Sequence, residues 1–227
     1  MKAQHLYSPG FFHLAVVGTS GCGKSSFINA VHGLSNNHDS DDSIVARTEI
    51  VECTNKATRY PDPRPNSRII WYDIPSAGTP NMPDWQYFNN LGLYIFDCII
   101  VLFDNRFSES NLTILRTCEQ FKNVEAFIVR SKSDQHINNM AFTACDKMPQ
   151  GFDPSDIDDK LTHDRFRQIK SEEQRRFIDK TRQNVQTNLE SNNLSPQKVY
   201  IVCKDAMLTM WSNSLSSKAI DEAETLE

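Results

Sequence analysis

Five short runs of apolar residues punctuate the chain, and each is bounded by polar or turn-forming residues. They cover residues 11–17, 68–74, 98–103, 125–130 and 199–203. Their hydrophobicity is continuous rather than alternating, which is typical of strands that are buried on both faces of a parallel sheet. The more alternating run at 49–55 predicts a sixth strand at the sheet edge.

Helical spacing of apolar residues fills the intervals between these runs. Such patterns follow Lys24, cover 108–121 and 171–189, and resume after Asp205, and Ser171–Gln174 has the form of a capping box. Strands that alternate with helices predict an α/β fold in three layers, a mainly parallel six-stranded sheet with helices on both faces.

The length of the chain fits one such domain over residues 1–227, because 227 residues bury one sizeable core and are marginal for two. Two connections stand out within it. The stretch at 35–48 begins with a polar run. The stretch at 138–168 is rich in Asp, Pro and Gly, which predicts a long insertion or loop, and a short helix around 156–168 stays open within it.

Composition narrows the function classes. The formal net charge is −5, which argues against nucleic acid as a partner, since phosphate contacts need clustered Lys and Arg. The six cysteines form no CxxC pair and no metal-ligand spacing. No signal region and no membrane-spanning apolar run is present, so we expect a cytoplasmic protein whose chain contains no direct membrane anchor.

The stretch "GTSGCGKS" at 18–25 has the pattern G-x-x-x-x-G-K-S and lies between a predicted strand and a predicted helix. Glycines allow successive backbone N–H groups to form an anion-binding nest, and the helix N-terminus adds its positive dipole end. Lys24 is then expected to neutralise the β and γ phosphates and Ser25 to ligate Mg²⁺. The predicted phosphate contacts are Ser20, Gly21, Cys22, Gly23, Lys24, Ser25 and Ser26.

Two further motifs follow predicted strands. Asp73 in "WYDIPSAG" is suited to hold the water shell of Mg²⁺, although an Asp at a strand end also caps turns. In "VRSKSD", residues Ser131, Lys132 and Asp134 resemble the N/T-K-x-D guanine signature, with Ser in place of Asn or Thr. Asp134 can accept two hydrogen bonds from guanine that adenine does not offer, and the Lys132 stem can cover the base.

A third loop, "VCKD" at 202–205, follows the last predicted strand. GTPases place a base-contacting loop there, so the backbone N–H groups of Cys203 and Lys204 are candidates, although a structural role is equally open. The order of the motifs along the chain indicates a Ras-like GTPase domain.

The sequence resembles the immunity-related GTPases, the interferon-inducible p47-type family, over roughly residues 10–135. The resemblance rests on "GTSGCGKSSFINAVHGL", "TEIVECTNKATRYPDP", "IIWYDIPSAGTPNMP", "FDNRFSESN" and "VRSKSD". It implies a Ras-like G domain that binds GTP or GDP with Mg²⁺ and hydrolyses GTP slowly, in many members faster after dimerisation across the nucleotide face. At this length the chain is expected to be essentially the G domain, and the family's helical domain is absent or truncated.

The resemblance also assigns switch residues within 35–48 and just beyond. Thr48 matches the threonine of the first switch, which closes on Mg²⁺ and the γ-phosphate, and Thr54 is an alternative. Glu52 matches a glutamate implicated in catalysis, although an exposed strand residue is an equal reading. Lys24, Thr48 and Glu52 are therefore the expected catalytic residues, and Ser25, Thr48 and Asp73 are the expected metal ligands.

The sequence departs from the family pattern at three positions. Ser76 occupies the glycine position of D-x-P-G, whose N–H contacts the γ-phosphate; Ala77 stands where Ras-type enzymes carry a water-positioning Gln; and Glu49 replaces a glycine. Without that Gln, hydrolysis should be slow unless a partner contributes. Two alternatives stay open: a nucleotide-binding switch with negligible hydrolysis, and an ATP-using phosphate-loop enzyme.

Overall fold

The structure is a computed structural model that describes residues 7–35, 46, 57–76, 84–121, 123–145, 160–212 and 216–226. Its described strands form one six-stranded sheet in the order β2-β3-β1-β4-β5-β6. Neighbouring strands are parallel, except that β2 and β3 are antiparallel. The strands are β1 (Phe12–Gly18), β2 (Thr58–Pro61), β3 (Ile69–Asp73), β4 (Cys98–Phe103), β5 (Glu125–Arg130) and β6 (Val199–Ile201).

The five apolar runs all become strands of this sheet, each within two residues of the predicted bounds. The predicted fold class, a mainly parallel six-stranded sheet with helices on both faces, is confirmed. The strand expected at 49–55 lies outside the described residues. The sheet edge next to β3 is instead formed by β2, which pairs Tyr60 with Trp71 of β3.

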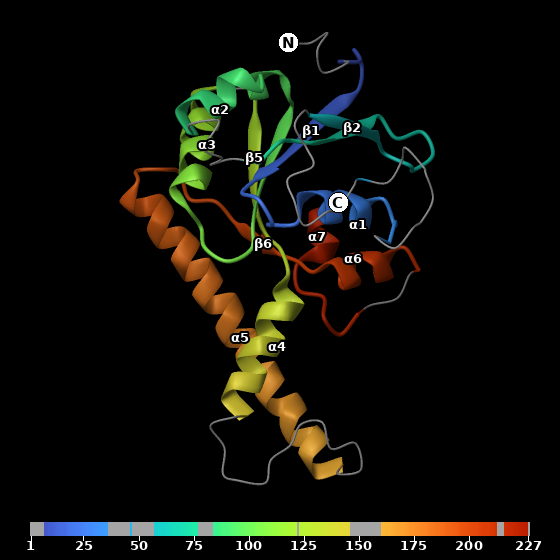
Figure 1. Cartoon of the computed structure of the whole chain (residues 1–227), viewed down its shortest axis with the longest axis vertical. Helices are drawn as coiled ribbons and strands as arrows, with labels where there is room; N and C mark the ends of the chain where they lie inside the picture. The colour runs from blue at the N-terminus through green and yellow to red at the C-terminus, as the bar shows by residue number, and fades with distance from the viewer. Residues whose placement is uncertain are drawn as a thin grey trace.

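Helices cover both faces of the sheet (Figure 1). In Figure 1, α2 and α3 lie on one side of the strands and α1 and α6 on the other. The helices are α1 (Lys24–Val31), α2 (Asp84–Asn90), α3 (Glu109–Gln120), α4 (Ser133–Cys145), α5 (Lys160–Ser191), α6 (Lys204–Met210) and α7 (Glu222–Leu226), with a 3₁₀ turn η1 (Leu93–Ile95).

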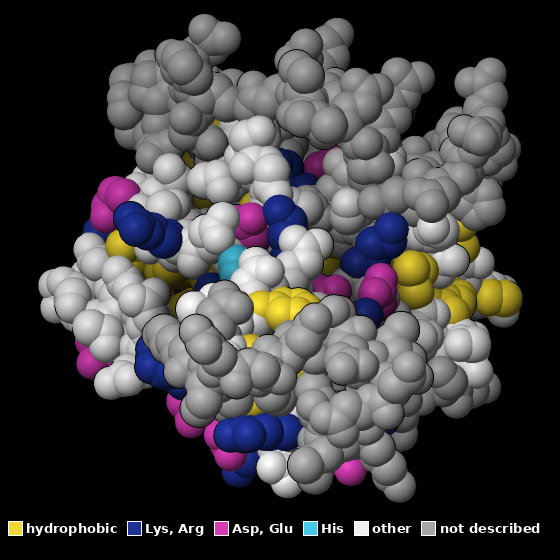
Figure 2. Space-filling view, turned by 60° about the horizontal axis from the view of Figure 1, so that its bottom comes forward, with side chains coloured by type: hydrophobic (Ala, Val, Ile, Leu, Met, Phe, Trp, Pro, Cys, Tyr) yellow, Lys and Arg dark blue, Asp and Glu magenta, His cyan; other side chains and the backbone are white. Residues whose placement is uncertain are grey.

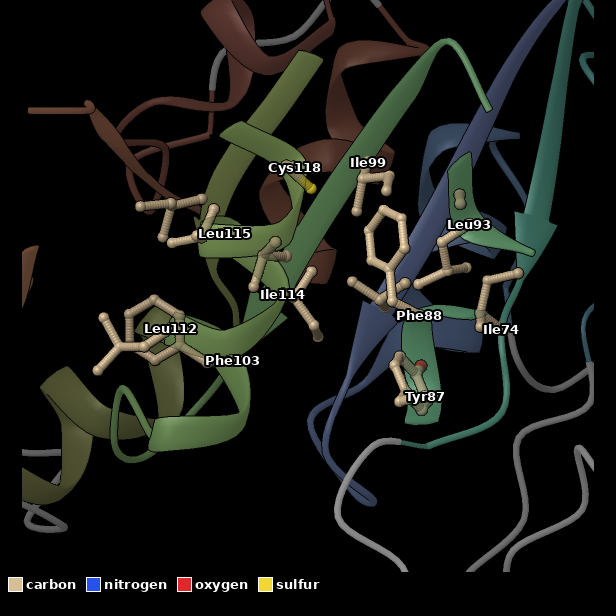
Figure 3. Packing of buried hydrophobic residues seen from close by; sticks show 14 of the residues in the cluster. Ile74, Tyr87, Phe88, Leu93, Ile99, Phe103, Leu112, Ile114, Leu115 and Cys118 are labelled. Atoms are coloured by element: carbon tan, nitrogen blue, oxygen red, sulfur yellow. The ribbon is translucent and has the colours of Figure 1, made fainter. Parts of the chain in front are cut away.

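Two hydrophobic cores explain why the strands read as continuous apolar runs. Ile99 and Val101 of β4 pack into one core, with residues of α2 and α3, whereas Ile100 and Leu102 pack into the other, with residues of α1. Figure 3 shows Ile99 between Phe88 of α2 and the side chains of α3. Alternate residues of one strand are therefore buried on opposite faces, and each fully buried aliphatic side chain contributes about 1.5–3 kcal/mol.

The connection expected at 138–168 is corrected by the structure. Residues 138–145 are the second half of α4, and residues 160–168 are the start of α5; residues 146–159 lie outside the description. Ala141 and Cys145 lie one turn apart on α4 and pack against Ile169 of α5, forming a small core of their own. The Asp-, Pro- and Gly-rich middle of the connection obscured this short apolar spacing.

Helix α5 also begins earlier than the apolar spacing indicates. It starts at Lys160, so Ser171 lies inside the helix and the predicted capping box is wrong. The first turns of α5 are mostly polar because they extend away from the sheet beside α4, as Figure 1 shows. Although α5 has 32 residues, no helix in the described ranges is both long and apolar enough to cross a bilayer.

Candidate nucleotide site

The predicted motifs meet at the carboxyl-terminal edge of the sheet. The loop at 18–23 follows β1, Asp73 ends β3, Ser131 and Lys132 follow β5, and the loop at 202–203 follows β6. Because the strands that carry these loops are parallel, their carboxyl ends lie at one edge, which is where ligands bind in open α/β sheets.

Direct contacts join the two main motifs. Ser131 Oγ donates a hydrogen bond to the carbonyl oxygen of Cys22 at 2.6 Å, although the two residues are 109 positions apart. Lys132 Nζ donates to the carbonyl oxygen of Gly21, also at 2.6 Å. The phosphate loop and the base motif therefore form one site.

The shape of the phosphate loop depends on its glycines. Gly21 and Gly23 have φ angles of 76° and 95°, a left-handed conformation that favours glycine. At Gly18, a Cβ atom would lie 2.2 Å from the carbonyl oxygen of Leu102, so β1 and β4 leave no room for a side chain. Helix α1 begins at Lys24 directly after Gly23, so the N-terminus of this helix lies at the phosphate loop.

Cys22 contributes backbone groups to the loop, because its thiol is fully buried. Burial raises the pKa of that thiol to about 11, which keeps it neutral and unreactive. Its N–H donates a long hydrogen bond of 3.4 Å to the carbonyl oxygen of Thr19. Cys22 is thus a packing residue of the loop, with no nucleophilic role.

The ammonium group of Lys24 is buried among neutral oxygens. Nζ donates to the carbonyl oxygens of Gly18 and Thr19 at 3.3 and 3.4 Å and to Ser76 Oγ at 2.9 Å. The Lys24 side chain makes no ion pair with any carboxylate in the described part of the chain, and the residue is 8% exposed. A buried cation with neutral partners is suited to bind a phosphate group.

Ser25 and Asp73 form the other side of the phosphate loop. Ser25 Oγ donates to Asp73 Oδ2 at 2.5 Å, while Asp73 Oδ1 is buried and has no hydrogen-bond partner. Burial raises the pKa of the Asp73 carboxyl, and the Ser25 hydrogen bond and the Lys24 charge oppose that shift. A buried carboxylate oxygen without a partner is costly unless it binds a cation.

This donor set fits Mg²⁺. The ion prefers oxygen ligands and is held by one or two protein groups together with phosphates and water. Among the described residues, no group of three or more His, Cys, Asp and Glu side chains converges to hold a metal without such help. Ser25 and Asp73 are therefore the described residues that could hold Mg²⁺ beside a bound nucleotide.

A cavity of about 280 Å³ adjoins the phosphate loop and contains the residues predicted to read the base. Lys132 and Asp134 line it from one side, and Ser26 and Lys204 line it from others. Lys132 has a φ of 57°, and its ammonium pairs with Asp104 Oδ2 at 2.9 Å. This pair and the hydrogen bond to the Gly21 carbonyl hold the Lys132 ammonium against the phosphate loop, and Lys132 also lines the cavity.

The prediction for Cys203 needs correction. Its backbone N–H donates to Glu222 Oε1 at 2.8 Å, so this group is already satisfied and does not line the cavity. Lys204, the first residue of α6, does line the cavity. A carboxylate from the C-terminal segment thus takes the hydrogen bond that the sequence assigned to the base.

Three site residues were missed by the motifs. Asp104 follows β4 at the same sheet edge and could have been found from that position. Asp205 lines the base cavity and pairs with Lys218 at 2.6 Å. Glu222 is fully buried behind the loop at 202–203, and no local pattern marks it, because its partner is distant in the sequence.

Several predicted residues are not placed by the structure. Thr48, Glu52 and the alternative Thr54 lie outside the described residues, as do Glu49 and Ala77. Their roles therefore stay predictions.

Comparison with known proteins identifies the family. The model of the interferon-inducible GTPase family matches residues 6–157, which is more than half of the chain. The chain belongs to this family. The predicted resemblance to this family is confirmed.

Named relatives of the family match only part of the chain. Mouse interferon-inducible GTPase 1 is 33% identical over 146 residues, which are 64% of this chain and 33% of that protein. Mouse T-cell-specific guanine nucleotide triphosphate-binding protein 2 is 32% identical over 127 residues, 56% of this chain and 29% of that protein. The chain thus spans about a third of the length of the curated relatives that it matches.

The solved structures that the chain matches are more distant in sequence. Toc33 from Arabidopsis thaliana has a TM-score of 0.49 at 13% identity, covering 96% of this chain and 82% of that one. Era from Aquifex aeolicus has a TM-score of 0.41 at 14% identity, covering 90% and 57%.

Proposed function

We propose that this chain binds GTP with Mg²⁺ at the carboxyl edge of its sheet and hydrolyses it slowly to GDP and phosphate. The observation that carries this proposal is the pair of hydrogen bonds from Ser131 and Lys132 to the phosphate-loop carbonyls. Asp134 and Gly23 line the same cavity, which supports the binding of a purine in the cavity while the phosphate chain lies at the loop.

The residues divide the work by charge. The nest at 20–26 and the buried Lys24 ammonium bind phosphate oxygens. Asp134 accepts the ring N–H and the amino group of guanine, and the Lys132 stem covers the base. Mg²⁺, when bound by Ser25 and Asp73, neutralises charge on the phosphates.

Hydrolysis is proposed to be slow in the isolated chain. By the resemblance, Thr48 closes on the γ-phosphate and Mg²⁺ and Glu52 takes part in catalysis, while Ala77 supplies no group that positions water. We further propose that a second copy, docked across the nucleotide face, raises the rate. The cytoplasmic location is part of the same proposal.

Binding and turnover test the proposal directly. Fluorescent GDP, GTP and ATP analogues are titrated onto nucleotide-free protein, and phosphate release from GTP is followed at several protein concentrations. We expect Mg²⁺-dependent binding of guanine nucleotides, little ATP binding, and a rate per subunit that rises with concentration. Equal affinity for ATP and GTP would instead favour an ATP-using enzyme.

Two variants separate phosphate binding from base reading. Lys24→Ala should abolish binding of every nucleotide. Asp134→Asn should shift the preference from guanosine towards xanthosine nucleotides, because the amide donates where the carboxylate accepted. Asp179→Asn, an exposed site on α5, is the matched control and should behave as the wild type. Unchanged base selectivity in Asp134→Asn would show that Asp134 does not read the base.

The second candidate function is a nucleotide-binding switch with negligible hydrolysis. It is favoured by the hydrogen bond from Lys24 Nζ to Ser76 Oγ, because this hydroxyl occupies a donor that a γ-phosphate would use. Tight, Mg²⁺-dependent nucleotide binding without phosphate release at any protein concentration would establish this function.

A further inference from the structure

A second cavity, of about 880 Å³, lies between the loop after β4, the end of β5, α4 and α5. It shares no lining residue with the base cavity. Helices α4 and α5, which form much of its wall, cross in the lower half of Figure 1. The nucleotide motifs do not use this cavity.

The charge of its lining is strongly positive. Arg106, Arg130, Arg176 and Lys180 contribute four cations, and Glu173 is the one carboxylate among the lining residues. Glu173 already pairs with Arg176 at 3.4 Å. Figure 2 shows Lys and Arg side chains interspersed with Asp and Glu side chains on this face of the molecule, with one histidine at the surface. This lining contrasts with a chain of formal net charge −5.

Arg130 is the least exposed of these cations. Its guanidinium stacks over the ring of Phe177 at 4.3 Å and donates to Thr181 Oγ1 and to the carbonyl oxygen of Asp104. It forms no ion pair with a carboxylate in the described part of the chain, since Asp104 pairs with Lys132. Burial lowers the pKa of Arg130, and the nearby Asp104 charge opposes that shift.

His136 completes the wall. Its ring stacks on Phe177 with centroids 5.6 Å apart, and its Nε2 atom is buried without a hydrogen-bond partner. Three amide side chains, Asn105, Asn139 and Asn184, also line the cavity. The lining thus offers several cationic donors, together with amides that can bind hydroxyl groups.

We propose that this cavity binds a small soluble molecule that carries at least two phosphate groups. The unbalanced lining charges need more than one anionic group, and the volume exceeds that of a single phosphate. A concave wall with charges of one sign raises the local potential and attracts such a ligand. Planar guanidinium groups suit phosphate oxygens because they donate two parallel hydrogen bonds.

Occupation of this cavity acts on the nucleotide site. Arg130 directly precedes Ser131, and His136 lies on the first turns of α4, whose second residue is Asp134. A ligand held by Arg130 and His136 stabilises the segment that reads the base. This second part of the proposal rests on the proposed function, whereas the binding itself does not.

Calorimetric titration with inositol hexakisphosphate tests the binding in a Lys24→Ala background, where the phosphate loop is disabled. Wild-type protein saturated with GDP and Mg²⁺ provides the same test without that substitution. We expect Arg176→Gln with Lys180→Gln to weaken binding by about tenfold or more, since two charge-assisted contacts are lost. The matched control, Lys170→Gln with Arg175→Gln, removes equal charge from α5 outside the cavity lining and should change the affinity less than about twofold.

Equal weakening by both double variants would mean diffuse attraction to a basic surface only, and the proposal would fail. A shift of the His136 ring resonances on addition of the same probe is the second expected result, and unshifted histidine resonances would contradict it. Co-sedimentation with phosphatidic acid vesicles that depends on Arg176 and Lys180 would show that the cavity binds a lipid headgroup, and it would overturn the proposal of a small soluble ligand. We expect fluorescent GDP to be released more slowly when the probe is bound. An unchanged release rate would refute the proposed effect on the nucleotide site but would leave the binding proposal standing.

Discussion

Glu222 holds the loop between β6 and α6 beside the nucleotide site, and its replacement should make that loop less stable. It is fully buried on α7, and its two carboxylate oxygens accept the backbone N–H groups of Cys203 at 2.8 Å and Ile220 at 2.5 Å. The first bond holds the loop between β6 and α6, and Lys204, the residue that directly follows this loop, lines the base cavity. Replacing Glu222 should therefore affect both stability and nucleotide release.

The magnitude follows from these two bonds. Hydrogen bonds to a charged acceptor contribute about 1.5–3 kcal/mol each, and burying the carboxylate offsets part of that gain, so Glu222→Ala should lower the free energy of unfolding by about 2–4 kcal/mol. Glu222→Gln keeps an acceptor for Cys203 but turns an N–H towards the N–H of Ile220. Because water can reach the partly exposed Ile220 bond, this variant should lose only about 1–2 kcal/mol.

The pH dependence of stability gives a second test of the role of Glu222. Burial raises the pKa of the Glu222 carboxyl, although the hydrogen bonds from Cys203 and Ile220 oppose that shift. The folded protein therefore binds the proton more tightly than the unfolded chain does. The contribution of this shift to stability is fully present below the unfolded pKa and is lost as pH rises through the folded value. The Gln variant should lack this component.

Urea unfolding and the release rate of fluorescent GDP measure the two effects. Glu224→Gln, on the same helix but exposed, is the matched control, because its surface pair with Lys198 contributes little. We expect GDP release to be slowest in the wild type, faster in Glu222→Gln and fastest in Glu222→Ala. Loss of stability without faster release would show that Glu222 does not position the loop, and unchanged stability would refute the whole argument.

Three further predictions concern other regions. Gly18→Ala should leave little folded protein by circular dichroism, because its Cβ would lie 2.2 Å from a backbone carbonyl oxygen of β4; a folded variant would show that the strands separate easily. Ser76→Gly should raise the ratio of GTP to GDP affinity, since it frees Lys24 for the γ-phosphate, and Ser76→Ala should do the same if the hydroxyl alone is responsible. Burial raises the pKa of the Asp62 carboxyl, but the hydrogen bonds from Arg64 outweigh it and hold that pKa at about 2. Its stabilising contribution is therefore present above 3.8 and lost as pH falls through about 2, a loss that Asp62→Asn should remove in urea titrations between pH 2 and 5.

Much of the site could be predicted because it depends on local conformation. The glycines of 18–23 and the lysine that follows them specify a loop and a helix start from within a few residues. Asp73 and Asp134 each lie at or just after a buried strand, and parallel strands bring such positions to one edge. The pairing of Ser131 with the Cys22 carbonyl then follows from the order of the strands.

The sequence by itself determined the five parallel strands and the phosphate loop, because burial on both sheet faces demands continuous apolar runs and a tight anion nest demands glycine. Only the tertiary structure decided that Glu222 accepts the N–H of Cys203, and that α4 and α5 line a basic cavity. Both features bring together groups from distant segments of the chain. Packing and the need to satisfy buried polar groups decide which of these groups meet, and neither requirement leaves a periodic pattern in the sequence.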